Sequence, residues 1–151
     1  MEQKLETLTM ISFDSNNIMH HKAKREFLLD SDFRKYFGEM FLKNEEEYFA
    51  NSNGIELKKI YFIQDENQII GLIRFFSYHE LGFVNIQYAV LPDFRKQGYG
   101  KKIVREITHY LMNNGSIKCI ETDIDKSNIE SIKTVLSAGY QNENGKYKYR
   151  R

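Results

Sequence analysis

The sequence contains very little cysteine and proline, and its charges nearly cancel. Among 151 residues there is one cysteine, Cys119, and one proline, Pro92. A single cysteine excludes a disulfide within the chain and is typical of a reducing compartment, and its apolar neighbours predict that Cys119 packs in the core. Lysine and arginine number 22 against 21 aspartate and glutamate residues, so no overall field favours nucleic acid or a membrane surface as a partner.

Long apolar runs are also missing. No run approaches the roughly 20 residues that cross a bilayer, and the first residues lack the layout of a signal peptide, so a cytoplasmic protein is predicted. No histidine has metal-ligand spacing with cysteine or carboxylate residues, and we therefore predict no metal site; the histidines are His20, His21, His79 and His109. The length predicts a single domain over residues 1–151. Both a monomer and a homodimer are compatible with the sequence.

The stretch from Val84 to Gly115 predicts a strand, a glycine-containing loop and an amphipathic helix. Residues 84–91 are rich in β-branched, aromatic and long apolar side chains, which is typical of a buried strand. Pro92 ends this strand because proline donates no hydrogen bond to a ladder. After a polar loop, Gly98 and Gly100 open a segment whose apolar residues recur at helical spacing, namely Ile103, Val104, Ile107, Tyr110 and Leu111.

The start of this helix has the features of an anion site. A helix N-terminus presents unpaired backbone N–H groups and the positive end of the helix dipole. Basic residues crowd the loop and first turn, where an isolated helix favours acidic ones; they are Arg95, Lys96, Lys101 and Lys102. A solvated basic patch would explain the charges alone, but together with the two glycines they favour a phosphate ligand.

The spacing narrows the choice of phosphate ligand. The dinucleotide pattern G-x-G-x-x-G needs a third glycine where Ile103 stands, and the P-loop pattern is absent. The chain instead reads Arg95-x-x-Gly98-x-Gly100 between a strand with a proline and an amphipathic helix. This segment closely resembles the acyl-CoA-binding motif of the GNAT superfamily of N-acyltransferases, Gln/Arg-x-x-Gly-x-Gly/Ala. A second region is similar to that family at Asn128, Ser131 and Gly139-Tyr140.

The order of predicted elements also resembles the GNAT order along nearly the whole chain. It predicts an α/β fold with a mixed central β-sheet, antiparallel in its first half and with a parallel crossover around the central helix, flanked by helices. The expected strands are 5–13, 59–64, 69–78, 84–91 and 117–124, followed by a hairpin over 140–149. The other expected helices are 20–29, 31–50 and 128–138.

Two details of these helices are specific expectations. The helix over 31–50 is expected to begin at Ser31 or Asp32 as its N-cap. The helix over 128–138 is expected to turn four apolar residues inward, namely Ile129, Ile132, Val135 and Leu136.

The resemblance implies an acetyl-CoA site between two strands that splay apart, 84–91 and 117–124. In the family the pantetheine arm hydrogen-bonds to the open edge of the first strand, here near Ala89 and Val90, and the pyrophosphate lies on the following loop. The cofactor-binding residues so implied are Ala89, Val90, Arg95, Lys96, Gln97, Gly98, Tyr99, Gly100, Lys101 and Asn128. Asn128 is equally suited to be an ordinary helix N-cap, and the two roles are compatible.

Two residues that are usual in the family are absent. Val135 stands where many members have a tyrosine general acid, and Asn85 stands where many have a glutamate general base. A thiol with a pKa of about 8.5 can leave without an acid. The amine can lose its proton through water held by Asn85 or to a nearby carboxylate, that of Glu80, Glu121 or Asp123. The candidate catalytic residues are Asn85, Glu80 and Ser131.

The function implied by the resemblance is direct transfer of an acetyl group from acetyl-CoA to a primary amine, of a small molecule or of a peptide. Two alternatives belong to other classes. One is a sensor or interaction module of the same fold that binds acyl-CoA without turnover, as the missing acid and base suggest. The other is an unrelated nucleotide-phosphate binder, against which the missing third glycine counts.

Overall fold

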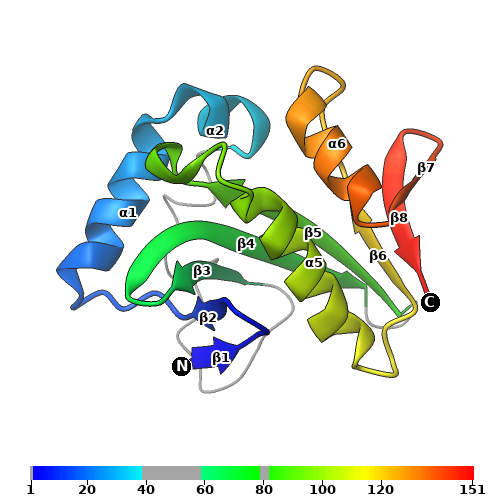
Figure 1. The fold of residues 1–151 in the computed structure, drawn as a ribbon, viewed down its shortest axis with the longest axis horizontal. Helices are drawn as coiled ribbons and strands as arrows, with labels where there is room; N and C mark the ends of the chain where they lie inside the picture. The colour runs from blue at the N-terminus through cyan, green and yellow to red at the C-terminus, as the bar shows by residue number, and fades with distance from the viewer. Residues whose placement is uncertain (1, 39–58, 79–81) are drawn as a thin grey trace.

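A computed structural model shows a mixed sheet flanked by helices and describes residues 2–38, 59–78 and 82–151 (Figure 1). The sheet has eight strands in the order β1-β2-β3-β4-β5-β6-β8-β7. The strands are β1 (Glu2–Lys4), β2 (Thr9–Ile11), β3 (Ile60–Asp65), β4 (Gln68–Tyr78), β5 (Phe83–Val90), β6 (Cys119–Thr122), β7 (Gln141–Glu143) and β8 (Lys146–Arg150). Among the strands of the described ranges, only β5 and β6 pair in parallel, so the predicted mixed sheet with its parallel crossover is confirmed.

The helices cover both faces of this sheet. They are α1 (Ile18–Leu29), α2 (Ser31–Tyr36), a 3₁₀ turn at Pro92–Phe94, α5 (Tyr99–Met112) and α6 (Ile129–Ser137). α5 and α6 contribute to one apolar cluster, while α1 and α2 contribute to a second cluster on the opposite face. In β3, successive residues alternate between these clusters, with Tyr61 and Ile63 in the first and Ile60 and Phe62 in the second.

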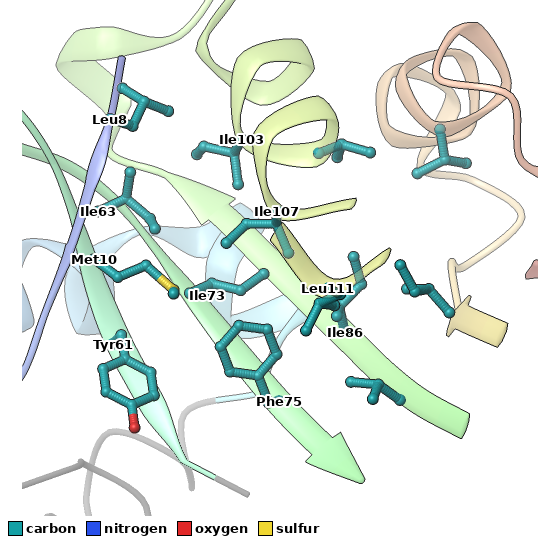
Figure 2. Packing of buried hydrophobic residues seen from close by; sticks show 14 of the residues in the cluster. Leu8, Met10, Tyr61, Ile63, Ile73, Phe75, Ile86, Ile103, Ile107 and Leu111 are labelled. Atoms are coloured by element: carbon teal, nitrogen blue, oxygen red, sulfur yellow. The ribbon is translucent and has the colours of Figure 1, made fainter. Parts of the chain in front are cut away.

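α5 provides the centre of the first cluster. Its residues Ile103, Ile107 and Leu111 lie over the sheet and face Ile73, Phe75 and Ile86 (Figure 2). All six are at most 1% exposed. The apolar spacing read from the sequence is therefore the face that the helix buries, and this packing holds the N-terminus of α5 at a set place above the end of β5.

The N-terminal segment differs from its expected form. The single strand predicted over 5–13 is wrong: the chain forms β1 and β2, joined by a tight turn in which the N–H of Leu5 donates to the carbonyl of Leu8 at 2.8 Å. The predicted N-cap is also wrong, because α2 begins after Asp30, whose side chain accepts from the N–H of Phe33 at 3.1 Å. Residues 39–50 of the expected second helix lie outside the described residues.

α6 buries a different face from the predicted one. Val135 is fully buried and Ile132 is partly buried, but Ile129 is 52% and Leu136 47% exposed. The expectation for those two residues is wrong because Ser131 and Thr134 lie beside Val135 on the inner side of the helix, along a pocket. The inner face of α6 is therefore partly polar, and apolar spacing alone placed it wrongly.

The remaining expectations concern Cys119, membrane-spanning helices and metal ligands. Cys119 is fully buried in β6, and burial raises the pKa of its thiol, so the predicted packing role is confirmed. Within residues 2–38, 59–78 and 82–151, no helix is long and apolar enough to cross a bilayer. Across the same ranges, no three histidine, cysteine or carboxylate side chains gather where they would hold a metal ion.

Candidate functional site

The centre of the site is the point where β5 and β6 separate. These strands pair in parallel over only three residues, 83–85 with 119–121, after which β5 continues beside β4 alone. The N–H of Leu91 donates to the carbonyl of Ile70 on β4 at 2.9 Å. Since peptide groups alternate sides along a strand, the N–H groups of Tyr88 and Val90 face the open edge. The predicted splay is confirmed, and it leaves backbone donors available to a ligand.

The loop after β5 forms a second set of backbone donors. Gly98 is the N-cap of α5 at φ 86°, in the left-handed region that favours glycine, and it supplies no side-chain cap. No acidic residue lies in the first turn of α5. The N–H groups of Tyr99, Gly100 and Lys101 therefore have no partner inside the helix and lie at the positive end of its dipole. This arrangement suits an anion such as a phosphate group.

One pocket of about 800 Å³ joins these two sets of donors. It is lined by β5, by the loop before α5 and the first turn of that helix, by the segment that follows β6, and by α6. Helix α2 lines the remaining side. Of the residues predicted to bind a cofactor, all but Gln97 line it: Ala89, Val90, Arg95, Lys96, Gly98, Tyr99, Gly100, Lys101 and Asn128. The side chain of Gln97 instead donates to the carbonyl of Asp93 at 3.1 Å.

The basic residues of the loop are not equivalent. Lys96 and Lys101 line the pocket, and neither has an ion pair or a hydrogen-bonded side chain within the described part of the chain. Lys102 lies outside the pocket wall, with its ammonium 5.8 Å from the centroid of the Tyr99 ring. Arg95 lines the pocket but its guanidinium is bound to Asp30. Two cations are therefore available to an anionic ligand without breaking a contact.

The tyrosines of the site differ in their partners. The Tyr99 hydroxyl donates to Asp65 at 2.7 Å, which ties the start of α5 to the β3–β4 turn. The Tyr88 hydroxyl is the one buried side-chain oxygen or nitrogen that lacks a hydrogen bond in the described ranges. Burial raises the pKa of Tyr88, and the nearby hydroxyls of Ser131 and Thr134 offset this only in part, without reaching hydrogen-bonding geometry. Tyr88 therefore stays protonated and keeps one donor unused.

α6 brings two of the predicted residues to the pocket. Asn128 is the N-cap of α6, and its side-chain oxygen accepts from the N–H of Ser131 at 3.4 Å. Its predicted capping role is confirmed, while binding of a cofactor stays a prediction. Ser131 lines the pocket beside the Tyr88 hydroxyl.

Two carboxylates lie beside the point where β5 and β6 separate. Asp123 follows β6 directly, lines the pocket and accepts a hydrogen bond from the side chain of Asn85 at 3.2 Å. Asn85 itself is 6% exposed and lies behind the pocket wall. Glu121 is also buried, with Lys148 at 4.0 Å, and does not line the pocket. Of the carboxylates proposed from the sequence and described here, only Asp123 therefore reaches the cavity, and Glu80 lies outside the described residues.

Two further features of the site had no clear signal in the sequence. Asp30 had no assigned role, although an aspartate before a helix is a common N-cap signal. Its ion pair with Arg95 joins residues 65 positions apart, which no local pattern could indicate. Tyr88 belonged to a strand pattern that predicts burial, and the pattern does not show that its hydroxyl would lack a partner.

Comparisons with known proteins agree with this geometry. The family model described as "Acetyltransferase (GNAT) family" matches residues 26–140. A protein of Bacillus subtilis (strain 168), the uncharacterized N-acetyltransferase YnaD, is 26% identical over 125 residues, which span 81% of this chain and 74% of that protein.

Solved structures share the fold. The crystal structure of the aminoglycoside acetyltransferase AAC(6')-Ib in complex with coenzyme A has a TM-score of 0.74 at 19% identity, over 96% of this chain and 94% of that one. A GNAT-family acetyltransferase from Bacillus anthracis has a TM-score of 0.74 at 20% identity, over 99% and 96% of the two chains. A spermidine N-acetyltransferase chimera with a Vibrio cholerae component has a TM-score of 0.66 at 13% identity, over 96% of each chain.

Proposed function

The chain belongs to the acetyltransferase (GNAT) family, and from this premise we propose that it transfers an acetyl group from acetyl-CoA directly to a primary amine. The observation that supports this most strongly is the single pocket that joins the open edge of β5 to the N-terminus of α5. Coenzyme A has a phosphate-rich end and an amide-rich arm. These chemistries match the helix N-terminus with Lys96 and Lys101 and the unpaired peptide groups of β5, respectively.

In the proposed complex the pyrophosphate lies on the backbone of residues 98–101 and the pantetheine arm lies along β5. The N–H groups of Tyr88 and Val90 are the donors that the arm or the thioester carbonyl would meet. A backbone donor beside that carbonyl would stabilise the oxyanion formed when the amine attacks. Asn128 and Ser131 would complete the wall of the same channel from α6.

The transfer requires attack by the amine on the thioester and departure of the CoA thiolate. The amine nitrogen attacks the thioester carbon, the C–S bond breaks and CoA leaves as a thiolate. After the attack, the nitrogen carries a strongly acidic proton, which we assign to Asp123 directly or through one water. Asn85 would hold the Asp123 carboxylate in place through the 3.2 Å hydrogen bond. No acid is assigned to the thiolate, because a group with a pKa of about 8.5 leaves unaided at neutral pH.

The charges of the pocket favour an acceptor that carries positive charge. Four carboxylates line its walls, namely Asp32, Asp123, Asp125 and Glu130. Among solved neighbours, one aminoglycoside acetyltransferase is seen with kanamycin and another protein is named a spermidine N-acetyltransferase. Both molecules are polyamines in the chemical sense, so they are suitable first acceptors to test here.

The deciding experiment measures release of the CoA thiol from acetyl-CoA in the presence of spermidine, kanamycin or a lysine-containing peptide, with mass spectrometry of the amine. We expect release together with one added acetyl group on at least one amine. Calorimetric titration with acetyl-CoA runs in parallel. Tight binding without release for any amine would support the alternative, a module of the same fold that binds acyl-CoA without turnover.

A further inference from the structure

Arg95 makes its contacts within the protein, although it occupies the first position of the loop motif. Its Nε donates to the carbonyl of Val90 at 3.1 Å, and its two terminal nitrogens donate to the two carboxylate oxygens of Asp30, one of them at 3.2 Å. A weaker contact runs to Asp32 at 3.8 Å. The fork of the guanidinium is thus filled by one bidentate carboxylate and one carbonyl.

Asp30 is the joint between α1 and α2. Its N–H donates to the carbonyl of Phe27 at 3.1 Å and ends α1, while its side chain caps α2 by accepting from Phe33 at 3.1 Å. The side chain is only 10% exposed. Burial alone would raise the pKa of Asp30, but the hydrogen bonds and charge of Arg95 outweigh it, so the pKa lies below its ordinary value. The anionic form of Asp30 is therefore stabilised by Arg95, together with the backbone N–H groups of Phe33 and Asp32.

The pair connects two walls of the pocket. On one side, Arg95 precedes the loop that forms the N-terminus of α5. On the other, Asp30 begins the helix that supplies the opposite pocket wall, which consists of Asp32, Phe33, Tyr36 and Phe37. Phe33 stacks on Phe37 at 4.7 Å between ring centroids and makes a tilted contact with Phe27 at 5.1 Å, so this wall is packed against the α1–α2 joint.

We propose that Arg95 is a positioning residue that ties the α2 wall of the pocket to the α5 loop through Asp30, and that it is not a ligand of the phosphate groups. This inference rests on the proposed function in one respect, namely that the loop before α5 binds CoA and that α2 faces the amine acceptor. If the Arg95 side chain rotated toward a phosphate group of the ligand, the carboxylate of Asp30 would lose its cation. Lys96 and Lys101 can meet a phosphate without that loss.

Conservative substitutions separate the two roles. Binding a phosphate needs a positive charge, which Arg95→Lys keeps. The contacts with Asp30 and with the carbonyl of Val90 need the planar guanidinium group and its Nε, which lysine lacks. Asp30→Asn removes the ion pair but keeps an oxygen that can cap α2. Lys101→Gln is the matched control, because it removes one pocket cation that has no ion pair or side-chain hydrogen bond within the described residues.

The first readout is hydrogen exchange of the amides of Phe37 and Gly38, which donate to the carbonyl of Phe33 at 2.8 and 3.2 Å. We expect faster exchange, by about tenfold, in Arg95→Lys and in Asp30→Asn, and no further increase in the double variant because both remove one interaction. Lys101→Gln should leave this exchange unchanged. Unchanged exchange in Arg95→Lys would overturn the proposed tie.

The second readout is calorimetric titration with CoA at several salt concentrations. We expect Arg95→Lys and Asp30→Asn to change the Kd for CoA by less than about threefold, while Lys101→Gln raises it and flattens its salt dependence. A tenfold loss in Arg95→Gln that Arg95→Lys restores would overturn the proposal and make Arg95 a phosphate ligand.

The third readout is the split of kinetic constants with the amine that the wild-type chain acetylates. In Arg95→Lys we expect the KM for the amine to rise about tenfold while the KM for acetyl-CoA changes by less than about threefold. The reverse split would overturn the proposal. If the unchanged chain fails to bind CoA at all, the proposed function fails, whereas the exchange experiment still tests the tie by itself.

Discussion

Gly98 and Gly100 both belong to the loop motif but have different physical roles. Gly98 has φ 86°, whereas Gly100 lies in the first turn of α5. A Cβ on Gly100 would meet the Tyr88 ring at 3.7 Å, an ordinary contact. We expect Gly98→Ala to lower the free energy of unfolding by about 1–2 kcal/mol and Gly100→Ala to raise it by about 0.5–1 kcal/mol, as measured by urea unfolding without ligand.

Gly98→Asn separates strain from ligand contact, because asparagine adopts the left-handed conformation more readily than alanine. We expect this variant to be close to the wild type in stability. Its affinity for CoA should nevertheless fall about tenfold, or about 1.4 kcal/mol, since a side chain would prevent close approach to the backbone. Wild-type affinity in a stable Gly98→Asn variant would contradict the proposed pyrophosphate site.

The unpaired Tyr88 hydroxyl predicts opposite effects on stability and on binding. A buried hydroxyl without a partner is destabilising, so Tyr88→Phe should raise the free energy of unfolding by about 1 kcal/mol. If the ligand supplies the missing partner, the same variant should bind CoA about threefold to tenfold more weakly. Urea unfolding and calorimetry measure the two effects.

Tyr140 is the matched control for Tyr88. Its hydroxyl lies 2.7 Å from Oγ1 of Thr108 and is buried, so Tyr140→Phe removes a made hydrogen bond. We expect this variant to be less stable by about 1 kcal/mol, with CoA affinity unchanged because Tyr140 does not line the pocket. Equal stability changes in the two variants would show that the Tyr88 hydroxyl is paired in solution.

At the scale of elements, Glu106 links α5 to the β1–β2 turn. Its side chain is fully buried and accepts from the N–H groups of Thr7 at 2.7 Å and Leu8 at 3.0 Å, and from the Thr7 hydroxyl. Burial alone would raise the pKa of Glu106, but these hydrogen bonds outweigh it and lower the pKa. The stabilisation is therefore present above the unfolded pKa of about 4.3 and is lost as pH falls through the lower folded pKa.

Glu106→Gln should lower the free energy of unfolding at neutral pH by about 1–3 kcal/mol, because an amide group cannot accept all three hydrogen bonds. The difference from the wild type should shrink below about pH 4, because the wild-type carboxylate is then protonated first in the unfolded state and, at lower pH, in the folded state. Urea unfolding at several pH values measures this difference in the free energy of unfolding. Glu2 is exposed, so Glu2→Gln is the control variant. A difference that stays constant down to about pH 3 would contradict this role.

Elements with strong local signals were predictable, and those that depend on partners far along the chain were not. Pro92 and the glycines marked the end of β5 and the start of α5, and the apolar spacing of α5 gave its buried face. The face of α6 was misjudged because Ser131 and Thr134 line a cavity that periodicity cannot show. The first strand was misjudged because the turn between β1 and β2 contains no glycine or proline.

The same division applies to the site. The loop and the splayed strands were predicted because the family motif is local and the splay follows from the implied fold. The ion pair of Arg95 with Asp30 and the hydrogen bond of Asn85 with Asp123 join residues 65 and 38 positions apart. Such pairs exist only once the sheet and helices bring them together, and the motif alone therefore assigned Arg95 to the ligand.

For the whole molecule, the cations of the pocket and its carboxylates are divided between different elements. Lys96 and Lys101 lie at the α5 end, whereas Asp123 lies where β5 and β6 separate. Arg95 at the α5 end is neutralised by Asp30, which sharpens this division. An anionic cofactor and a cationic acceptor would thus approach the thioester from opposite ends. The division also separates two kinds of variants, since a change of Lys96 or Lys101 should leave acceptor binding nearly unaffected and a change of Asp123 should leave cofactor binding nearly unaffected.

The pH dependence of turnover tests this arrangement as a whole. The rate with a primary amine should rise as the amine loses its proton and then level off. The rate should not decrease again at any pH up to about 10. Burial raises the pKa of both Tyr88 and Tyr140, and no tyrosine stands at position 135. We expect Asp123→Asn to lower kcat about a hundredfold or more without changing the Kd for acetyl-CoA, since Asp123 acts at the acceptor end. Steady-state kinetics across pH measure both effects. A steep alkaline fall would reveal a general acid, and a greater loss of kcat in Glu121→Gln than in Asp123→Asn would move the base to Glu121.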